Sequence, residues 1–439
     1  MTQTLDHFLA RFVRIEARER RAVFTAFALM FCVLGGYFSV RPVRETFGTI
    51  MGDTETAKVW TATAIAAIAI VPIYGWLVGR FARQVLLPAI YSVVAVGLMV
   101  VAAVTYADPE NYWNLRFYYV GISVCNLLLV SVFWSFLLEL FTSEQTKRLF
   151  GFIAAGGTTG ALVGPFITER SVEYIGNSGV LLFGATLFIG AVFLQRALLR
   201  VIDGFGTTAV QSSKDGGRTA AQGAAKRGTG GNPFAGILIV LRSPYLLGIA
   251  LFVFFISTAN TLLYFEQQRL VTDMFESREA RTQMFARIDF IVQSLTVLSQ
   301  LFLTGYIAKR IGVAALLTVV PVLMIGAFLL LAYSGVFLVL AGAMILRRWG
   351  EYAFIRPGRE MLWSRLDTET KYKAKNFVDV PVYRFSDAVV ARLQDALKAG
   401  GTSAGDVALM GAAAAVLWAI NGFLLGRAHD KADKADKPA

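Results

Sequence analysis

Histidine, cysteine and charge are all scarce in this 439-residue chain. It has two cysteines and two histidines, and charged residues make up 16% of it, whereas about 25% is usual for a soluble protein. Cys32 and Cys125 lie inside apolar runs, so no disulfide framework is expected. His7 and His429 lie in the terminal tails. The sequence shows no metal-ligand cluster, nucleophile motif or histidine–carboxylate set, so we expect neither an enzyme nor a bound cofactor or metal.

Hydrophobic residues, in contrast, make up 56% of the chain, and its mean hydropathy is +0.58. Apolar runs of about 20 residues, long enough to cross a bilayer as helices, recur along the sequence. We therefore predict an all-α integral membrane protein with about twelve transmembrane helices. The predicted spans are 22–42, 59–79, 85–106, 117–140, 149–169, 179–199, 245–265, 287–307, 313–333, 336–356, 377–397 and 406–426.

The longest break between spans divides the chain into two groups of six. Residues 201–235 are rich in Gly, Ser, Thr, Ala and Lys and have no apolar period, which is typical of a flexible linker. We predict a cytoplasmic amphipathic N-terminus, an N-terminal six-helix half, this linker, a C-terminal six-helix half and a disordered tail. Their ranges are 1–21, 22–200, 201–235, 236–427 and 428–439.

The net charge of +12 comes mostly from loops. Lys and Arg cluster in alternate loops and in the central linker, so the positive-inside rule places both termini in the cytoplasm. This excess does not require nucleic acid as a partner. The expected partners are the lipid bilayer and an anionic small molecule, and we expect a monomer. Charges within spans need a separate explanation, because each costs several kcal/mol unless it is paired or faces water.

The first predicted span ends in a charged group, Arg41, Arg44 and Glu45, around Pro42, which can kink or end a helix. Two interpretations stay open. The side chains could lie at the membrane interface with their charges in water. They could instead form a cationic group at the mouth of a cavity, where the planar fork of arginine suits a phosphate. Since Arg44 and Glu45 are adjacent, we expect them to point in different directions.

Two further polar groups close other spans. Glu139 ends the fourth span and could form a loop salt bridge or a gate. Asn260, Tyr264 and Glu266 close the seventh span, in the position that the Arg41 group occupies in the other half. We expect Asn260 and Glu266 to help line a cavity at the same depth.

The run over 150–165 contains Gly156, Gly160 and Gly164. Glycines can cradle phosphates, but this run lacks the Gly-Lys-Ser/Thr ending of a phosphate-binding loop. The exposed amides of a loop would also lack partners in lipid. The four-residue spacing instead predicts a close contact between two helices.

The tenth and eleventh spans carry the heaviest charge. In the tenth, the burial penalty predicts that at least one of Arg347 and Arg348 pairs with Glu351. Residues 356–375, between the two spans, are basic, and topology alone predicts a cytoplasmic loop there.

Three charged side chains of the eleventh span differ in their directions around the helix. By the 3.6-residue period, Arg384 lies about 140° from Asp379 and about 60° from Asp387. We therefore predict an Arg384–Asp387 pair and treat Asp379 as the freer group.

Several segments resemble one family of membrane proteins. They are IRPGREML at 355–362, KYKAKNFVD at 371–379, YR at 383–384, and FW at 133–134 with KRLFG at 147–151. They resemble the nucleotide transporter family of plastid and intracellular-bacterial ATP/ADP translocases and their free-living bacterial relatives. The resemblance covers nearly the whole membrane portion and is strongest over 356–379. It implies the two-repeat fold of the major facilitator superfamily, nucleotide exchange, and the bacterial inner membrane as the location.

The resemblance also implies roles for particular residues. The family uses a basic residue late in the first span, glutamates in the fourth and seventh spans, and a lysine just before the eleventh. These fall on Arg44, Glu139, Glu266 and Lys375. ATP/ADP translocases have Lys followed by an acid at the first position, where this chain has Arg44 and Glu45.

We therefore expect a secondary active transporter that exchanges nucleotides or related phosphorylated anions by alternating access. Two alternatives remain: a proton-coupled facilitator for another metabolite, such as a siderophore or drug-like anion, and a membrane assembly or receptor protein that transports nothing. The candidate substrate-binding residues are Arg41, Arg44, Glu45, Glu139, Asn260, Tyr264, Glu266, Arg347, Arg348, Glu351, Lys375, Asp379, Arg384 and Asp387.

Overall fold

The computed structural model describes residues 15–435 except 17, 204–234, 368–369, 371–373 and 376. Most of the predicted N-terminal segment 1–21 and of the predicted linker 201–235 lies outside these residues. The chain divides into two compact units, which we describe separately. One comprises Met1–Glu45 and Ile70–Gly231, and the other comprises Thr46–Ala69 and Asn232–Ala439. Helices α2 and α3 therefore contribute residues to both units.

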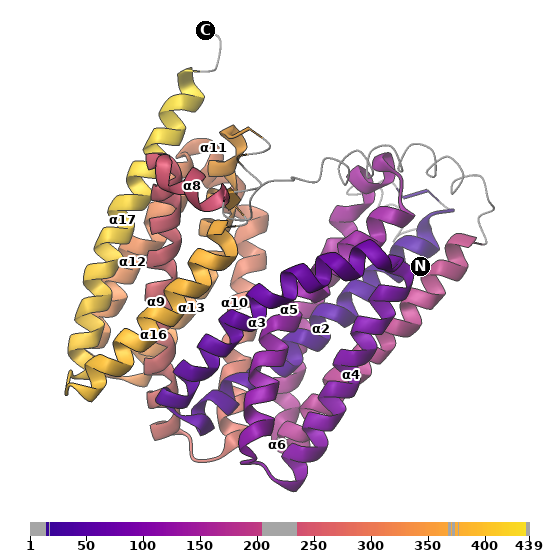
Figure 1. Cartoon of the computed structure of the whole chain (residues 1–439), viewed down its shortest axis with the longest axis horizontal. Coiled ribbons are helices and arrows are strands. Elements are labelled where there is room, and N and C mark those ends of the chain that lie inside the picture. The colour runs from indigo at the N-terminus through magenta and orange to yellow at the C-terminus, as the bar shows by residue number, and fades with distance from the viewer. Residues whose placement is uncertain are drawn as a thin grey trace. The chain divides into compact units, whose positions relative to one another are not determined.

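The first unit is built from long helices (Figure 1). They are α2 (Arg20–Met51), α3 (Asp53–Arg80), α4 (Arg83–Ala107), α5 (Tyr112–Leu140) and α6 (Ser143–Asp203). Helix α6 is two helices that join at Gly176, whose φ of 66° and ψ of 176° are not helical. Glycine adopts this positive φ without the steric cost of a side chain. The kink accounts for the two spans that the sequence predicts over 149–169 and 179–199.

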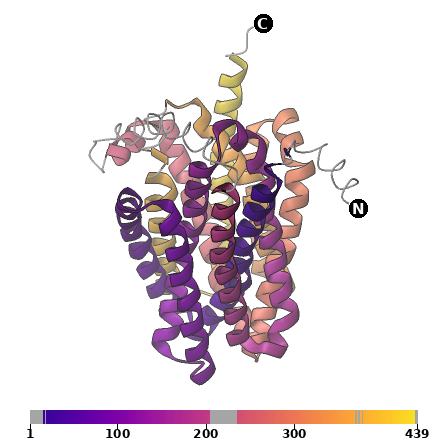
Figure 2. The ribbon, with the colours of Figure 1, turned by 90° about the vertical axis from the view of Figure 1, so that its right-hand side faces the viewer.

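The second unit contains the remaining helices (Figures 1 and 2). They are α8 (Ala235–Arg242), α9 (Pro244–Met274), α10 (Arg278–Phe302), α11 (Thr304–Arg310), α12 (Val313–Ser334), α13 (Phe337–Gly350), α14 (Arg356–Leu362), α16 (Tyr383–Ala399) and α17 (Ala404–Ala435). A π-helical turn, η1 (Glu351–Ile355), joins α13 to α14. A short 3₁₀ turn, η2 (Trp363–Arg365), follows α14. A second π-helical turn, η3 (Val378–Val382), precedes α16.

Among the described residues, nine helices are long and apolar enough to cross a membrane. One of them is the kinked α6, which supplies two spans. The predicted spans over 336–356 and 377–397 correspond to α13–η1–α14 and η3–α16, whose separate elements are each too short to be counted among the nine. The chain is thus an all-helical membrane protein, and the predicted fold class is confirmed.

The glycines of α6 hold it directly against α2. A Cβ added at Gly156 would lie 2.3 Å from the carbonyl oxygen of Phe27, and one at Gly160 would lie 2.4 Å from that of Phe31. At Gly164 the nearest atom would be the carbonyl oxygen of Gly35, at 2.6 Å. No side chain fits at such distances, which confirms that these glycines allow close helix packing.

The second unit has a continuous apolar core that includes the fully buried Phe252, Trp363 and Trp418. Helix α12 packs along α17, and the two are fastened at one end by Asp430. Its carboxylate accepts hydrogen bonds from the backbone N–H groups of Val313 and Ala314, at 2.9 and 3.1 Å, and so caps the start of α12.

The structure corrects the predicted disordered tail over 428–439 as far as Ala435, and the remaining residues lie outside the part of the chain that it describes. Helix α17 continues to Ala435, beyond the capping carboxylate of Asp430. The sequence pattern alone did not reveal the bond that draws this end of the helix onto α12.

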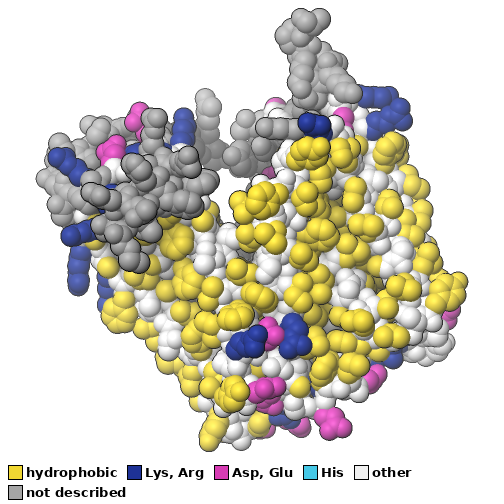
Figure 3. Space-filling view, turned by 180° about the vertical axis from the view of Figure 1, so that it is seen from behind, with side chains coloured by type: hydrophobic (Ala, Val, Ile, Leu, Met, Phe, Trp, Pro, Cys, Tyr) yellow, Lys and Arg dark blue, Asp and Glu magenta, His cyan; other side chains and the backbone are white. Residues whose placement is uncertain are grey.

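Hydrophobic side chains dominate the described surface visible in Figure 3. Over the described residues as a whole, the exposed hydrophobic side chains include Ile65, Val93, Phe117, Phe193 and Leu338. A soluble protein rarely exposes so many large apolar side chains together, whereas lipid tails solvate them.

Candidate functional site

Helix α2 does not end at Pro42. It continues to Met51, so Arg41 lies about 15 Å along the axis from the end of the helix. The helix therefore runs through Pro42, and the charged group lies within the helix and not at its end. Proline costs one backbone hydrogen bond, and the packing of α2 against α6 keeps the helix intact around it.

The first arginine triad comprises Arg41, Arg44 and Glu45. Arg44 Nη2 contacts Glu45 Oε1, and Arg41 Nη2 lies 3.9 Å from the same oxygen. The expectation that Arg44 and Glu45 point apart is thus wrong, because the long arginine side chain folds back onto its neighbour. Arg44 also donates to Ser123 Oγ at 3.2 Å and lies 5.4 Å from the ring centre of Tyr119. Helix α5 therefore fixes the direction of this arginine.

Glu139 lies elsewhere in the first unit. It pairs with Arg83 at 2.9 Å, and its side chain is 38% exposed. Along α5 it is about 24 Å from Ser123, which contacts the first triad. The structure thus separates Glu139 from that triad and places it in a salt bridge between the ends of α4 and α5.

The second arginine triad comprises Arg347, Glu351 and Arg356. Arg347 Nη1 lies 3.0 Å from Glu351 Oε2, which confirms the predicted pairing in the tenth span. Arg356 donates through Nε and Nη2 to Glu351 Oε1 at 3.3 and 3.2 Å. The ring of Tyr352 lies 4.5 Å from the Arg356 guanidinium carbon. One carboxylate thus contacts two guanidinium groups.

The π-helical turn η1 makes this second triad possible. In an α-helix, residues five apart point about 140° away from each other. In η1 the N–H of Arg356 instead bonds to the C=O of Glu351, the five-residue pattern of a π-helix. This wider turn brings Arg356 back toward Glu351. It also corrects the predicted loop, because residues 356–362 continue the helix as α14.

The members of the second triad differ in exposure. The side chains of Arg347 and Glu351 are 8% and 12% exposed, whereas that of Arg356 is 55% exposed. Arg356 is therefore the most accessible member of the triad.

Arg348 points to a different partner from its neighbour. Its Nη1 contacts the carboxylate of Asp289 on α10, and both side chains are almost fully buried. Its Nε and Nη2 are buried and have no hydrogen-bond partner among the described residues. Asp289 was not among the predicted site residues, although a lone acid near the start of a predicted span is a sequence signal for such a partner.

Helix α16 carries a buried carboxylate. Asp387 accepts a hydrogen bond from Ser257 of α9 at 2.5 Å and lies 3.6 Å from Arg384, as predicted for that pair. Asp379, expected to be the freer group, instead lies 3.3 Å from Arg359 of α14. Angular positions around a single helix cannot show a partner that another helix supplies.

Lys375 pairs with a side chain that the sequence analysis did not single out as a site residue. Its Nζ lies 2.5 Å from Glu360 Oε2, and the two side chains are 27% and 54% exposed. Lys375 thus joins the group of ion pairs around α14.

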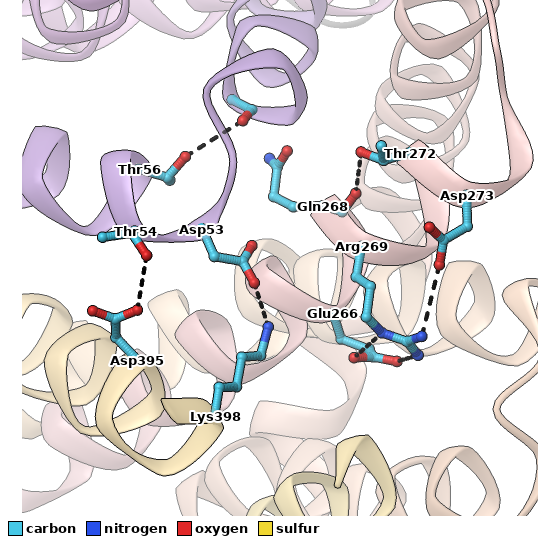
Figure 4. A network of polar contacts seen from close by, with 11 residues as sticks. Asp53, Thr54, Thr56, Glu266, Gln268, Arg269, Thr272, Asp273, Asp395 and Lys398 are labelled. Carbon is cyan, nitrogen blue, oxygen red and sulfur yellow. Dashed lines mark hydrogen bonds and ion pairs between the residues drawn. The ribbon is translucent and has the colours of Figure 1, made fainter. Parts of the chain in front are cut away.

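A separate polar network, drawn in Figure 4, joins the segment 46–69 to α16 within the second unit, and further ion pairs lie within α9. Lys398 contacts Asp53, and Thr54 donates to Asp395 at 3.1 Å. Nearby, Glu266 binds Arg269 at 2.5 Å.

Two other predicted residues lie on the same helix as Glu266. Tyr264 packs against Trp60, with ring centres 4.8 Å apart, and Asn260 is half-buried. Glu266 is about 14 Å along α9 from Ser257, the partner of Asp387. The structure thus places Glu266 and Tyr264 with the 46–69 segment and leaves them out of the second triad.

Comparison with solved structures identifies the fold. The structure resembles the nucleoside transporter NupG with a TM-score of 0.62 at 15% identity, covering 93% of this chain and 99% of that one. An auto-inhibited peptide transporter of the POT family also gives 0.62, at 16% identity over 93% of this chain and 97% of that one. The chain therefore has the fold of the major facilitator transporters.

Sequence comparison gives a narrower relationship. ADP,ATP carrier protein 1 of Chlamydia muridarum is 25% identical, with 87% of this chain and 83% of the carrier aligned. The Chlamydia trachomatis protein of the same name is 24% identical over the same shares. No family model matches the chain. It is a distant homologue of the chlamydial ADP,ATP carriers, which confirms the resemblance seen in its motifs.

Proposed function

We propose that this protein is a secondary active transporter that exchanges nucleotides or related phosphorylated anions across the bacterial inner membrane by alternating access. The observation that carries the proposal is the second arginine triad, in which two guanidinium groups share one carboxylate at the end of the predicted span over 336–356. The names of the chlamydial relatives support the choice of substrate class.

The charge balance around this triad supports an anionic substrate. The ion pairs described above for α13, α14, α16 and the turns beside them contain six cations and five carboxylates, one positive charge more than negative. The cations are Arg347, Arg348, Arg356, Arg359, Lys375 and Arg384, and the carboxylates are Glu351, Asp289, Asp379, Glu360 and Asp387. Charges inside a membrane protein are costly and usually functional. Pairs that only held helices together would need no excess.

The chemistry of the exposed member also fits. Arg356 presents a planar fork that can make two parallel hydrogen bonds to a phosphate, and the adjacent Tyr352 offers an aromatic face. A nucleotide requires both kinds of contact, one for its phosphates and one for its base.

The test is transport by the purified protein in liposomes. We expect labelled ATP to enter liposomes that contain unlabelled nucleotide much faster than empty ones, because bound anion offsets the excess positive charge. Equal uptake with and without internal nucleotide would contradict exchange, and no uptake of any nucleotide or phosphorylated metabolite would contradict the substrate class.

A matched pair of variants tests the role of Arg356. Arg356→Gln should reduce ATP uptake about tenfold or more. Arg310→Gln is the control, because Arg310 is also exposed and also lies over a tyrosine four residues earlier, with its guanidinium carbon 5.1 Å from the Tyr306 ring centre. It is not among the cations paired around the second triad, so uptake should not change.

A proton-coupled facilitator is the second candidate, and Asp387 favours it. This carboxylate is 5% exposed and bonds to Ser257, so its protonation could accompany transport. Uptake driven by a pH gradient alone would select this candidate over exchange. For a protein that transports nothing, neutralising Arg384 and Asp387 together would restore the stability that each single change loses.

A further inference from the structure

We propose that Glu351 competes with the substrate's phosphate for Arg356, and that Arg347 holds Glu351 after it is displaced. This inference rests on the proposed function and names the residue that releases the binding arginine. Its basis is the geometry of the second arginine triad.

Glu351 already occupies the groups that a phosphate would use. Its Oε1 accepts from both Nε and Nη2 of Arg356, at 3.3 and 3.2 Å. These two N–H groups form one edge of the guanidinium fork, the edge that binds an oxyanion with two bonds. An arriving phosphate therefore gains this edge only when Glu351 leaves it.

Arg347 lowers the energetic cost of that displacement. It binds the other oxygen, Oε2, at 3.0 Å, so Glu351 keeps an ionic partner when Arg356 turns away. Without Arg347, the displaced carboxylate would be an uncompensated charge at a site where it is only 12% exposed, which is strongly unfavourable. The two oxygens thus have separate roles: one is exchanged for substrate and the other anchors the side chain.

The difference in exposure sets the order of events. Arg356 is 55% exposed and Arg347 is 8% exposed, so the substrate meets the exchangeable partner and leaves the anchoring one in place. Competition of this kind also favours product release, because Glu351 returns to Arg356 as the phosphate departs. A site without the competitor would bind more tightly and turn over more slowly.

The first measurement is ATP binding to the purified full-length protein in detergent, by calorimetry. Glu351→Gln keeps the shape of the side chain and removes its charge. We expect the Kd for ATP to fall about tenfold, because Arg356 is released and a nearby negative charge is lost. In liposomes the same variant should show a lower KM and a lower maximal exchange rate, since a tighter ligand dissociates more slowly.

Two further variants separate competition from simpler effects. Asp273→Asn removes one negative charge from an exposed position beside Arg269, so it changes net charge equally and should leave the Kd unchanged. Arg347→Gln combined with Glu351→Gln restores the net charge and leaves no buried arginine without its partner. We expect this double variant to fold as the wild type does and to retain a several-fold gain in affinity.

The possible results separate the two proposals. If Glu351→Gln weakens ATP binding or leaves it unchanged, Glu351 only positions Arg356. The proposal that Glu351 competes with the phosphate is then wrong. An equal gain in Asp273→Asn would also contradict it, because net charge alone would then explain the effect. If the wild-type protein binds neither ATP nor inorganic pyrophosphate, the proposed function fails, and this inference fails with it.

Discussion

The two arginine triads have the same composition, two arginines and one glutamate, but they differ in how far their arginine side chains are exposed. In the first triad both arginine side chains are 15% exposed and the glutamate is 8% exposed. In the second, one arginine is buried and the other is 55% exposed. The first triad lies within an unbroken α-helix, whereas the second straddles a π-helical turn. A single extra residue in one turn thus separates a buried ionic group from one with an exposed arginine.

The largest expected effect tests the burial of the first triad. Glu45→Ala should lower the free energy of unfolding by about 3–5 kcal/mol, because two poorly exposed guanidinium groups lose this carboxylate. Chemical denaturation in detergent measures it. Glu139→Ala is the control, since its pair with Arg83 is partly exposed and is worth about 0.2–1 kcal/mol. Similar losses in both variants would mean that the first triad is as well hydrated as a surface pair.

The next prediction concerns the packing that holds the first triad in place. Gly160→Ala should cost about 1–3 kcal/mol, because the new Cβ would lie 2.4 Å from the Phe31 carbonyl oxygen and would push α6 off α2. Gly151→Ala on the same helix has no neighbour within 4 Å of the new Cβ, so it should not destabilise the protein. Thermal unfolding of the two variants compares them directly, and equal midpoints would refute the packing argument.

A smaller effect tests the exposed arm of the second triad. Tyr352→Leu should weaken ATP binding by about 0.5–1 kcal/mol, the worth of an exposed cation–π contact. Calorimetry measures the change. Tyr306→Leu, which removes the same contact from Arg310, should leave the affinity unaltered. If both variants bind ATP as the wild type does, Tyr352 does not contribute to the site.

The smallest expected effect lies outside both triads, in the network of Figure 4. Lys398 and Asp53 are 27% and 30% exposed, so Lys398→Ala should cost about 0.2–1 kcal/mol. A double-mutant cycle with Asp53→Ala isolates the pair, and added salt should reduce the coupling. A salt-independent coupling larger than that of the first triad would overturn the contrast between buried triads and exposed pairs.

Much of the fold could be predicted from the sequence because the bilayer imposes one length on every spanning helix. The glycine spacing over 156–164 likewise predicted a close helix contact, since only a residue without a side chain permits it. The Arg347–Glu351 and Arg384–Asp387 pairs were predictable for a similar reason, because residues three or four apart share a helix face. Each of these inferences needs only one helix.

The errors arose where a second element contributes. Asp379 was expected to be free, but α14 supplies Arg359. Asp289 was overlooked, although it is the partner of Arg348 from another helix. Helix α2 was expected to end near Pro42, yet it continues to Met51, and its Gly48 lies against Tyr264 and Gln268 of α9.

The sequence by itself determined the class of molecule: a helical membrane protein with few histidines and cysteines and an unusual load of arginine and carboxylate within its spans. Composition suffices for this, because hydrophobic length and the cost of buried charge do not depend on which helices meet. Only the tertiary structure decided which charged side chains pair and which of them are exposed. Arg356 is five residues from Glu351, a spacing that an α-helix would separate, and only the π-helical turn brings the two together and leaves the arginine exposed.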